Sequence, residues 1–146
     1  MPVGSVTEAR DGIHALFKAA FDAASFSPTP QLRYMGLQEE TPDGDIAWLR
    51  ISVRHNESVQ AAMGGSTSRR FRRYGLVIVE IRTPMADNDG LTQNDNIANV
   101  MRDTFEGATA ADGAIWFRNA RVREIGVDGA WFQTNVLADF MYDEVR

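Results

Sequence analysis

Arginine is concentrated in one short segment of the sequence, Arg69-Arg70-Phe71-Arg72-Arg73-Tyr74, which follows a stretch of small residues that contains Gly64 and Gly65. Guanidinium groups bind phosphate in a planar, bidentate manner, and aromatic rings stack on bases, so contact with a nucleic acid is one interpretation. A second is contact with an acidic surface on a protein partner. The third is a solvated strand edge whose charges discourage pairing with other strands. The candidate interface residues are Gly64, Gly65, Arg69, Arg70, Phe71, Arg72 and Arg73.

The rest of the sequence contains no pattern that predicts catalysis or a bound cofactor. Cysteine is absent, and neither His14 nor His55 has a carboxylate at metal-ligand spacing. The segment Asp87-Asn88-Asp89-Gly90 begins like a calcium loop, but its twelfth position is Ala98 where the EF-hand needs Glu. Phosphate-binding glycine motifs and a nucleophile elbow are also missing from the sequence. We therefore expect a protein that is not an enzyme and that carries no metal or cofactor.

The charge balance limits the kinds of partner. The chain has 15 basic and 20 acidic residues, a formal net charge of −5, and Lys18 is its only lysine. A globally basic surface for DNA is not expected from this balance. Asp143 and Glu144 are predicted to be exposed to solvent near the end of the sequence. No apolar run approaches the ~20 residues that a membrane helix needs, and Met1-Pro2-Val3-Gly4 does not resemble a signal peptide.

The apolar periodicity predicts two helices and a mostly antiparallel sheet. The middle of one predicted strand, Leu76-Val77-Ile78-Val79, is apolar on both faces, which is typical of a central strand. Residues 56–70 lack periodicity and are predicted to form a mobile loop. The expected elements are a helix capped by Ser5 or Thr7 and ended by Ser27-Pro28, strands at 32–36, 48–54 and 71–83, a helix at 91–105 capped by Thr92, and a hairpin of 115–125 and 131–142 with its turn at Gly126–Gly129.

This order of elements predicts an α+β fold in which both helices pack on one face of the sheet. The chain contains no internal repeat and no linker that would divide it. We therefore expect one domain that spans residues 1–146, with the mobile loop at 56–70 as its irregular part.

Several sequence segments, taken together with this order of elements, resemble a known family. They are Trp48-Leu49-Arg50-Ile51-Ser52-Val53, the run from Arg72 to Val79 before Pro84, Val122-Arg123-Glu124-Ile125-Gly126, Asp128 to Val136, and Phe140-Met141-Tyr142-Asp143-Glu144. The pattern is similar to the tail terminator proteins of long-tailed phages with non-contractile tails, including those encoded by prophages. It covers nearly the whole chain, and its motifs are packing and turn signatures.

The resemblance implies a structural virion protein without catalytic activity. Such a terminator forms a homo-hexameric ring on the head-proximal end of the tail tube, stops polymerisation of the tube protein and presents the surface that joins the head–tail connector. DNA passes through the ring without sequence-specific binding, and the ring is assembled in the host cytoplasm. One alternative is a head–tail joining or tail-completion protein at an adjacent ring. The other is a nucleic-acid-binding module that uses residues 69–73.

The flexible, arginine-dense segment from Gly64 to Arg73 would suit a subunit that stays monomeric until a tube is ready. We expect this segment to become ordered on contact with the tube protein or with a neighbouring terminator.

Overall fold

Two helices and six strands make up the chain in the computed structural model, which describes residues 3–27, 29–36, 46–62, 69–85 and 90–145, with the backbone alone at 60–62, 90 and 145. The elements are α1 (Val6–Ala24), β1 (Gln31–Tyr34), β2 (Trp48–Ala62), β3 (Arg70–Pro84), α2 (Gly90–Phe105), β4 (Thr109–Ala110), β5 (Ile115–Asp128) and β6 (Trp131–Val145). The strands form one sheet in the order β1-β2-β3-β6-β5-β4. Only β1 is parallel to its neighbour, so the predicted α+β domain with a mostly antiparallel sheet is confirmed.

Helix α1 begins where the sequence predicts it. The Ser5 hydroxyl accepts a hydrogen bond from the Glu8 backbone N–H at 3.2 Å, and the Glu8 carboxylate accepts one from the Gly4 N–H at 2.7 Å. These two bonds satisfy amide groups that the first turn leaves without helical partners. The helix ends at Ala24, before the predicted proline, because Ser25 takes a left-handed conformation (φ 49°) that closes the last turn.

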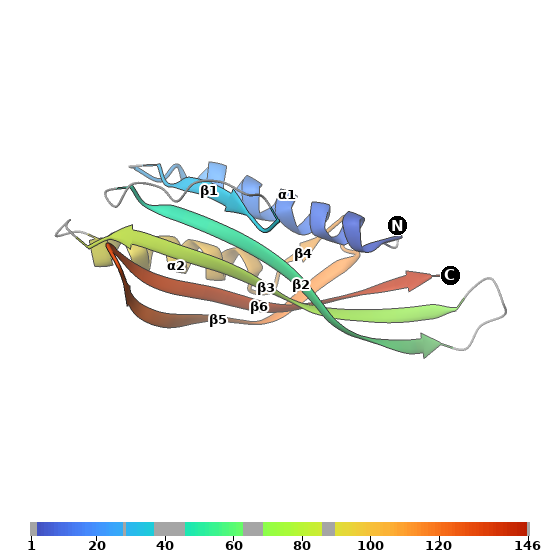
Figure 1. Cartoon of the computed structure of the whole chain (residues 1–146). Coiled ribbons are helices and arrows are strands. Elements are labelled where there is room, and N and C mark those ends of the chain that lie inside the picture. The colour runs from blue at the N-terminus through green and yellow to red at the C-terminus, as the bar shows by residue number, and fades with distance from the viewer. Residues whose placement is uncertain (1–2, 28, 37–45, 63–68, 86–89, 146) are drawn as a thin grey trace.

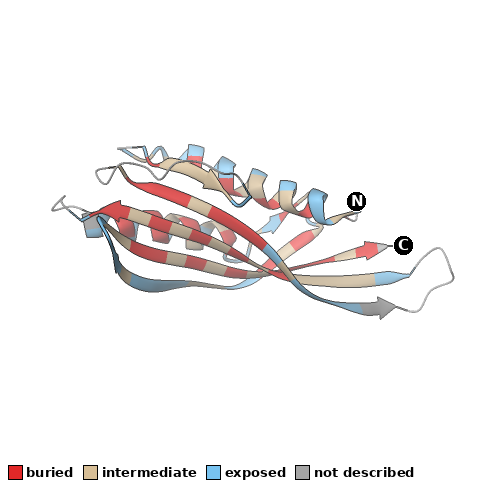
Figure 2. Ribbon diagram, in the orientation of Figure 1, coloured by how far each residue is buried: buried red, intermediate tan, exposed pale blue. Residues whose placement is uncertain are grey.

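The hydrophobic core lies between the helices and one face of the sheet. Figure 2 shows the alternation of buried and partly exposed residues along β3 and β6 that one covered face produces. Strand β3 lies between β2 and β6, as its apolar centre predicts. The core side chains include Ile13, Phe17 and Phe21 from α1, Ile97, Met101 and Phe105 from α2, and Leu49, Ile51, Val53, Val77, Val79, Ile81, Val136, Ala138, Phe140 and Tyr142 from the sheet.

The prediction of a mobile loop at 56–70 is wrong for most of the residues that the structure describes in this range. Strand β2 continues to Ala62, and residues 57–62 pair with residues 70–74 of β3. The period-two signal is lost because register shifts after His55 and after Gln60 each change the face on which the following residues lie. Residues 56–59 of β2 are also exposed, so polar residues do not mark a loop here. Gly64 and Gly65 lie outside the described residues.

Two other boundaries differ from the prediction. The β5–β6 hairpin turns at Gly129 and Ala130, since Asp128 pairs with Trp131, whereas Gly126 (φ 109°) occupies a bulge within β5. A positive φ at the first of two turn residues, as at Gly129 (φ 61°), suits a tight hairpin. Helix α2 begins at Gly90, so Thr92 lies inside the helix and is not its cap.

Candidate functional site

A three-stranded arm extends from the body of the molecule beyond the two helices (Figure 1). It consists of residues 55–62 of β2, 70–75 of β3 and 140–145 of β6, which pair in that order. The arginine-rich segment of the sequence lies in the central strand of this arm. Residues 70–73 are therefore already ordered in the single chain. This corrects the expectation that the whole segment from Gly64 to Arg73 becomes ordered only on contact with a partner. Residues 63–68 lie outside the described part.

The structure divides the predicted arginine cluster into arginines that are held in short ion pairs and arginines that are exposed. Arg72 belongs to the first class. Its guanidinium donates to both carboxylate oxygens of Asp143, with Nε–Oδ1 at 2.8 Å and NH2–Oδ2 at 3.2 Å. It also lies 5.5 Å from the centroid of the Trp116 ring. This bidentate bond lowers the pKa of Asp143 and raises that of Arg72. Arg72 therefore links β3 to β6, and its guanidinium is already bound to the carboxylate of Asp143.

Arg73 makes a second ion pair on the opposite face of the arm. Its Nε donates to Glu144 Oε2 at 2.8 Å, and its NH1 donates to the Ser58 hydroxyl. Glu144 is only 4% exposed, and the Arg73 guanidinium offsets part of the cost of burying its charge. Asp143 and Glu144 are thus not the solvated pair that the sequence predicts. The signal that reveals their role is the antiparallel register, which places Asp143 opposite Arg72.

Arg69 and Arg70 form the second class. Both are exposed at the start of β3. Arg70 lies 3.8 Å from Asp143, a carboxylate already bound by Arg72, and Arg69 has no partner within the described residues. Phe71 lies beside them, and its ring centroid is 5.6 Å from the guanidinium carbon of Arg73. The tip of the arm therefore offers two cations to a partner.

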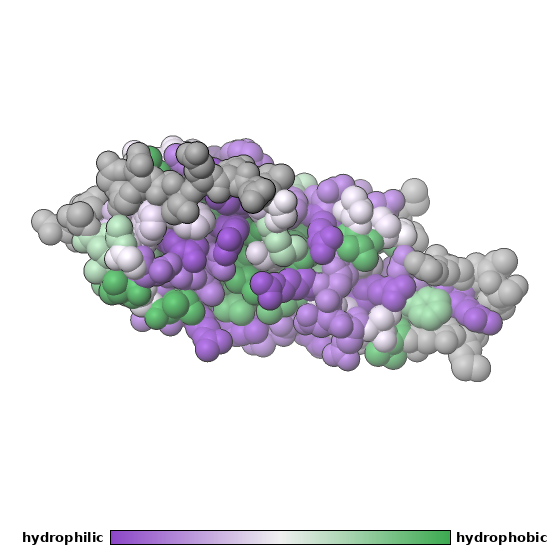
Figure 3. All heavy atoms as spheres, viewed as in Figure 1, coloured by the Kyte–Doolittle hydropathy of each residue, from purple (hydrophilic) through white to green (hydrophobic). Residues whose placement is uncertain are grey.

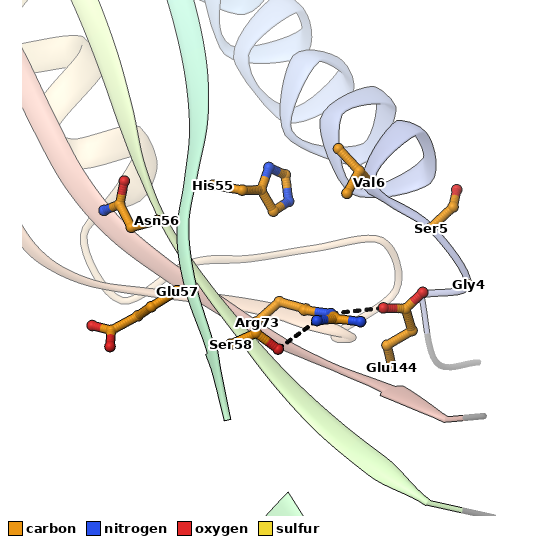
Figure 4. Close-up of a pocket in the computed structure, with 9 residues that line it drawn as sticks. All are labelled: Gly4, Ser5, Val6, His55, Asn56, Glu57, Ser58, Arg73 and Glu144. Atoms are coloured by element: carbon orange, nitrogen blue, oxygen red, sulfur yellow. Dashed lines mark hydrogen bonds and ion pairs between the residues drawn. The ribbon is translucent and has the colours of Figure 1, made fainter. Parts of the chain in front are cut away.

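A pocket of about 470 Å³ lies where the arm joins the body, between the start of α1 and strand β2 (Figure 4). The imidazole of His55 points from β2 toward α1, and the Arg73–Glu144 pair forms another wall. His55 Nε2 is 2.8 Å from the Tyr142 hydroxyl, while its Nδ1 is buried without a hydrogen-bond partner. Burial lowers the pKa of His55, and the nearby guanidiniums of Arg10 and Arg73 lower it further.

The lowered pKa of His55 makes stability depend on pH. The unfolded chain takes up a proton near the ordinary value of 6.5, whereas the folded chain resists it. This contribution is therefore complete above 6.5 and is lost as the pH falls through that value. We expect urea unfolding to give a lower free energy at about pH 5.5 than at about pH 7.5, and His55→Gln to reduce the difference. An unchanged difference in His55→Gln would contradict this account. His14, whose pKa burial also lowers, supplies the remainder.

The described residues do not reveal a metal centre or a membrane helix. In that part of the chain, no three His, Asp or Glu side chains gather closely enough to hold an ion. Its helices are too short or too polar to cross a bilayer. His14 instead packs edge-on against Tyr34, with ring centroids 5.1 Å apart. The calcium-like segment at 87–89 lies outside the described residues.

Comparison with known proteins agrees with this fold and with the family resemblance of the sequence. The family model described as phage tail terminator protein matches residues 12–138. A solved structure superposes with a TM-score of 0.60 at 16% sequence identity, and the match covers 94% of this chain and 95% of the other, which is a likeness of fold. No curated protein sequence matches the chain. Because the family model covers most of its length, the chain belongs to the phage tail terminator protein family and is a structural component of a phage tail.

Proposed function

We propose that the chain closes as a homo-hexameric ring on the head-proximal end of the tail tube. There it stops addition of the tube protein and presents the surface to which the head–tail connector binds. DNA passes through the ring without sequence-specific contacts. The observation that carries this proposal is the family match over residues 12–138, together with an arm whose tip bears exposed cations.

The arm suits contact with a protein better than contact with a nucleic acid. Arg72 and Arg73 are neutralised by Asp143 and Glu144, which leaves Arg69 and Arg70 as the available cations of the segment. Two cations on a chain of net charge −5 give a small electrostatic attraction to DNA. They are well suited to the carboxylates of a protein partner, which they would bind in a definite orientation.

This division of roles leads to a prediction for the arm tip. Arg69→Ala/Arg70→Ala removes two exposed cations and with them the long 3.8 Å pair of Arg70 with Asp143. It leaves the 2.8 Å pairs Arg72–Asp143 and Arg73–Glu144 in place, so the free energy of unfolding should change by less than about 1 kcal/mol. Binding to assembled tail tubes, measured by co-sedimentation, should weaken about tenfold. The matched control is Arg102→Ala, an arginine on α2 whose side chain is 39% exposed and which is no part of the arm. Equal binding by the two variants would contradict a role for the arm tip.

Sedimentation velocity tests the ring itself. A hexamer of 16.2-kDa chains has a mass of about 97 kDa, well separated from the monomer. We expect this species to accumulate as the protein concentration rises or when tail tubes are added. A chain that remains monomeric at all concentrations and fails to sediment with tubes would overturn the proposal. Steep, salt-dependent binding to duplex DNA would instead favour the nucleic-acid module.

A further inference from the structure

Large apolar side chains are exposed at the end of the molecule opposite the arm. We call Met85, Leu91, Ile125 and Val127 the end patch. These side chains are between 48% and 68% exposed. Figure 3 shows hydrophobic residues at the surface of this end. A group of exposed apolar residues at one end of a chain commonly marks a protein contact.

The members of the end patch are held together by contacts of the fold. Met85 donates its backbone N–H to the Ala130 carbonyl at 2.9 Å, which ties the end of β3 to the β5–β6 turn. Val127 pairs with Phe132 across that hairpin. The Asn94 amide of α2 donates to the Phe132 carbonyl at 3.0 Å and to the Thr83 hydroxyl at 3.2 Å. Because Leu91 lies one turn before Asn94, the start of α2 lies at the same end of the sheet.

The arm and the end patch lie at the two ends of the same strands. Strand β3 runs from Arg70 in the arm to Pro84 beside the patch, and β6 returns from Trp131 to Val145. Fifteen residues of extended chain span about 50 Å, so the two surfaces are too far apart to meet within one molecule. A ring subunit needs two different surfaces that fit each other, and the arm and the end patch lie at opposite ends of the subunit.

Their chemistry is complementary. The arm exposes Val59, which is 50% exposed, together with Glu57 and Arg69, neither of which is paired within the described residues, and Arg70, which lies 3.8 Å from Asp143. Beside the end patch, β5 exposes Arg123 and Glu124, which have no ion-pair partner in the described part of the chain, while Asp128 pairs with Arg82 at 3.1 Å. Each surface thus combines exposed apolar area with both signs of charge. Contact between them would bury the valines and pair the charges crosswise.

From this arrangement we infer that the arm of one copy docks on the end patch of the next copy, with Val59 against Val127. The inference rests on the proposed ring and names the surfaces that close it. The contact is head-to-tail, so every copy uses one arm and one patch. Val127→Asp places a charge in the buried part of this contact and should weaken self-association by about tenfold or more.

The absence of cysteine from the sequence allows a direct test. In Val59→Cys/Val127→Cys, mild oxidation of concentrated protein should produce a ladder of disulfide-linked multimers that stops at six chains. A mixture of the two single variants should give dimers and nothing larger, and each single variant alone should stay monomeric on a denaturing gel. Val59→Cys/Met35→Cys is the matched control, because Met35 is exposed directly after β1, where its backbone N–H donates to Ile51 in the middle of β2. This control should give no ladder.

The outcomes separate the contact from the ring. A 97-kDa species without the Val59–Val127 ladder would overturn the contact and leave the ring intact. Dimers of Val127→Cys alone would show that two patches meet symmetrically, which also overturns the contact. A ladder from chains that fail to stop tube growth would support the contact and contradict the proposed function. The absence of both ladder and ring would overturn both.

Discussion

Gly75→Ala is expected to destabilise the folded chain by about 3 kcal/mol or more. A Cβ at this position would overlap the ring of Phe140 and the backbone carbonyl oxygen of Arg54. The carbonyl belongs to the adjacent strand, and Phe140 is fully buried and packs against His55, with ring centroids 5.3 Å apart. Neither neighbour has space into which it could move, because protein interiors are densely packed. The arm therefore depends on a glycine where it joins the body.

Urea unfolding followed by circular dichroism measures this effect, and Gly12→Ala is its control. An added Cβ at Gly12 would lie 3.1 Å from Ala111 Cβ, a close contact with a side chain and not with backbone. Alanine also favours the helix by about 1 kcal/mol relative to glycine, so the two effects should largely cancel. A loss below about 1 kcal/mol in Gly75→Ala would show that the strands tolerate the methyl group and would contradict the proposed close approach.

Arg73→Met is expected to cost about 3 kcal/mol, whereas Arg72→Met should cost less than about 1 kcal/mol. Both arginines make 2.8 Å ion pairs between β3 and β6. The difference lies in the carboxylates, since the side chain of Glu144 is 5% exposed and that of Asp143 is 19% exposed. Removing Arg73 takes the facing cation away from a buried negative charge, whereas removing Arg72 leaves a charge that water and Arg70 still reach.

A double variant tests the cause of this difference. Glu144→Gln in the Arg73→Met background removes the buried negative charge that has lost this ion pair, and it should recover a substantial part of the lost free energy of unfolding. Glu144→Gln in the wild-type chain should be destabilising, because it weakens the intact Arg73–Glu144 ion pair. Equal losses in Arg73→Met and Arg72→Met, or no recovery in the double variant, would contradict the distinction between the buried and exposed pairs.

The sequence allowed the body of the fold to be predicted better than the arm. Apolar periodicity identified the core side of α1, because burial requires that spacing, and the run of apolar residues at 76–79 identified the central position of β3. In the arm, bulges shift the alternation after His55, and exposure removes the apolar signal, so residues 56–62 were predicted as a loop.

The candidate site was likewise only partly predictable from the sequence. The arginine segment was visible in the sequence, but the partners of Arg72 and Arg73 lie about 70 residues away and are brought near only by the pairing of β3 with β6. The end patch was missed for a related reason. The sequence predicts Ile125 at the end of a strand and Val127 in the turn that follows, and only the three-dimensional arrangement shows that both are exposed in β5, on either side of Gly126.

Growth of tail tubes in the presence of the purified chain tests the central claim most directly. Tubes assembled from the tube protein of the same phage would be imaged by electron microscopy as increasing amounts of the chain are added. The account predicts that elongation stops, and that each arrested tube carries a ring of six subunits at one end. Tubes that continue to lengthen at saturating chain, with no added density at either end, would contradict it.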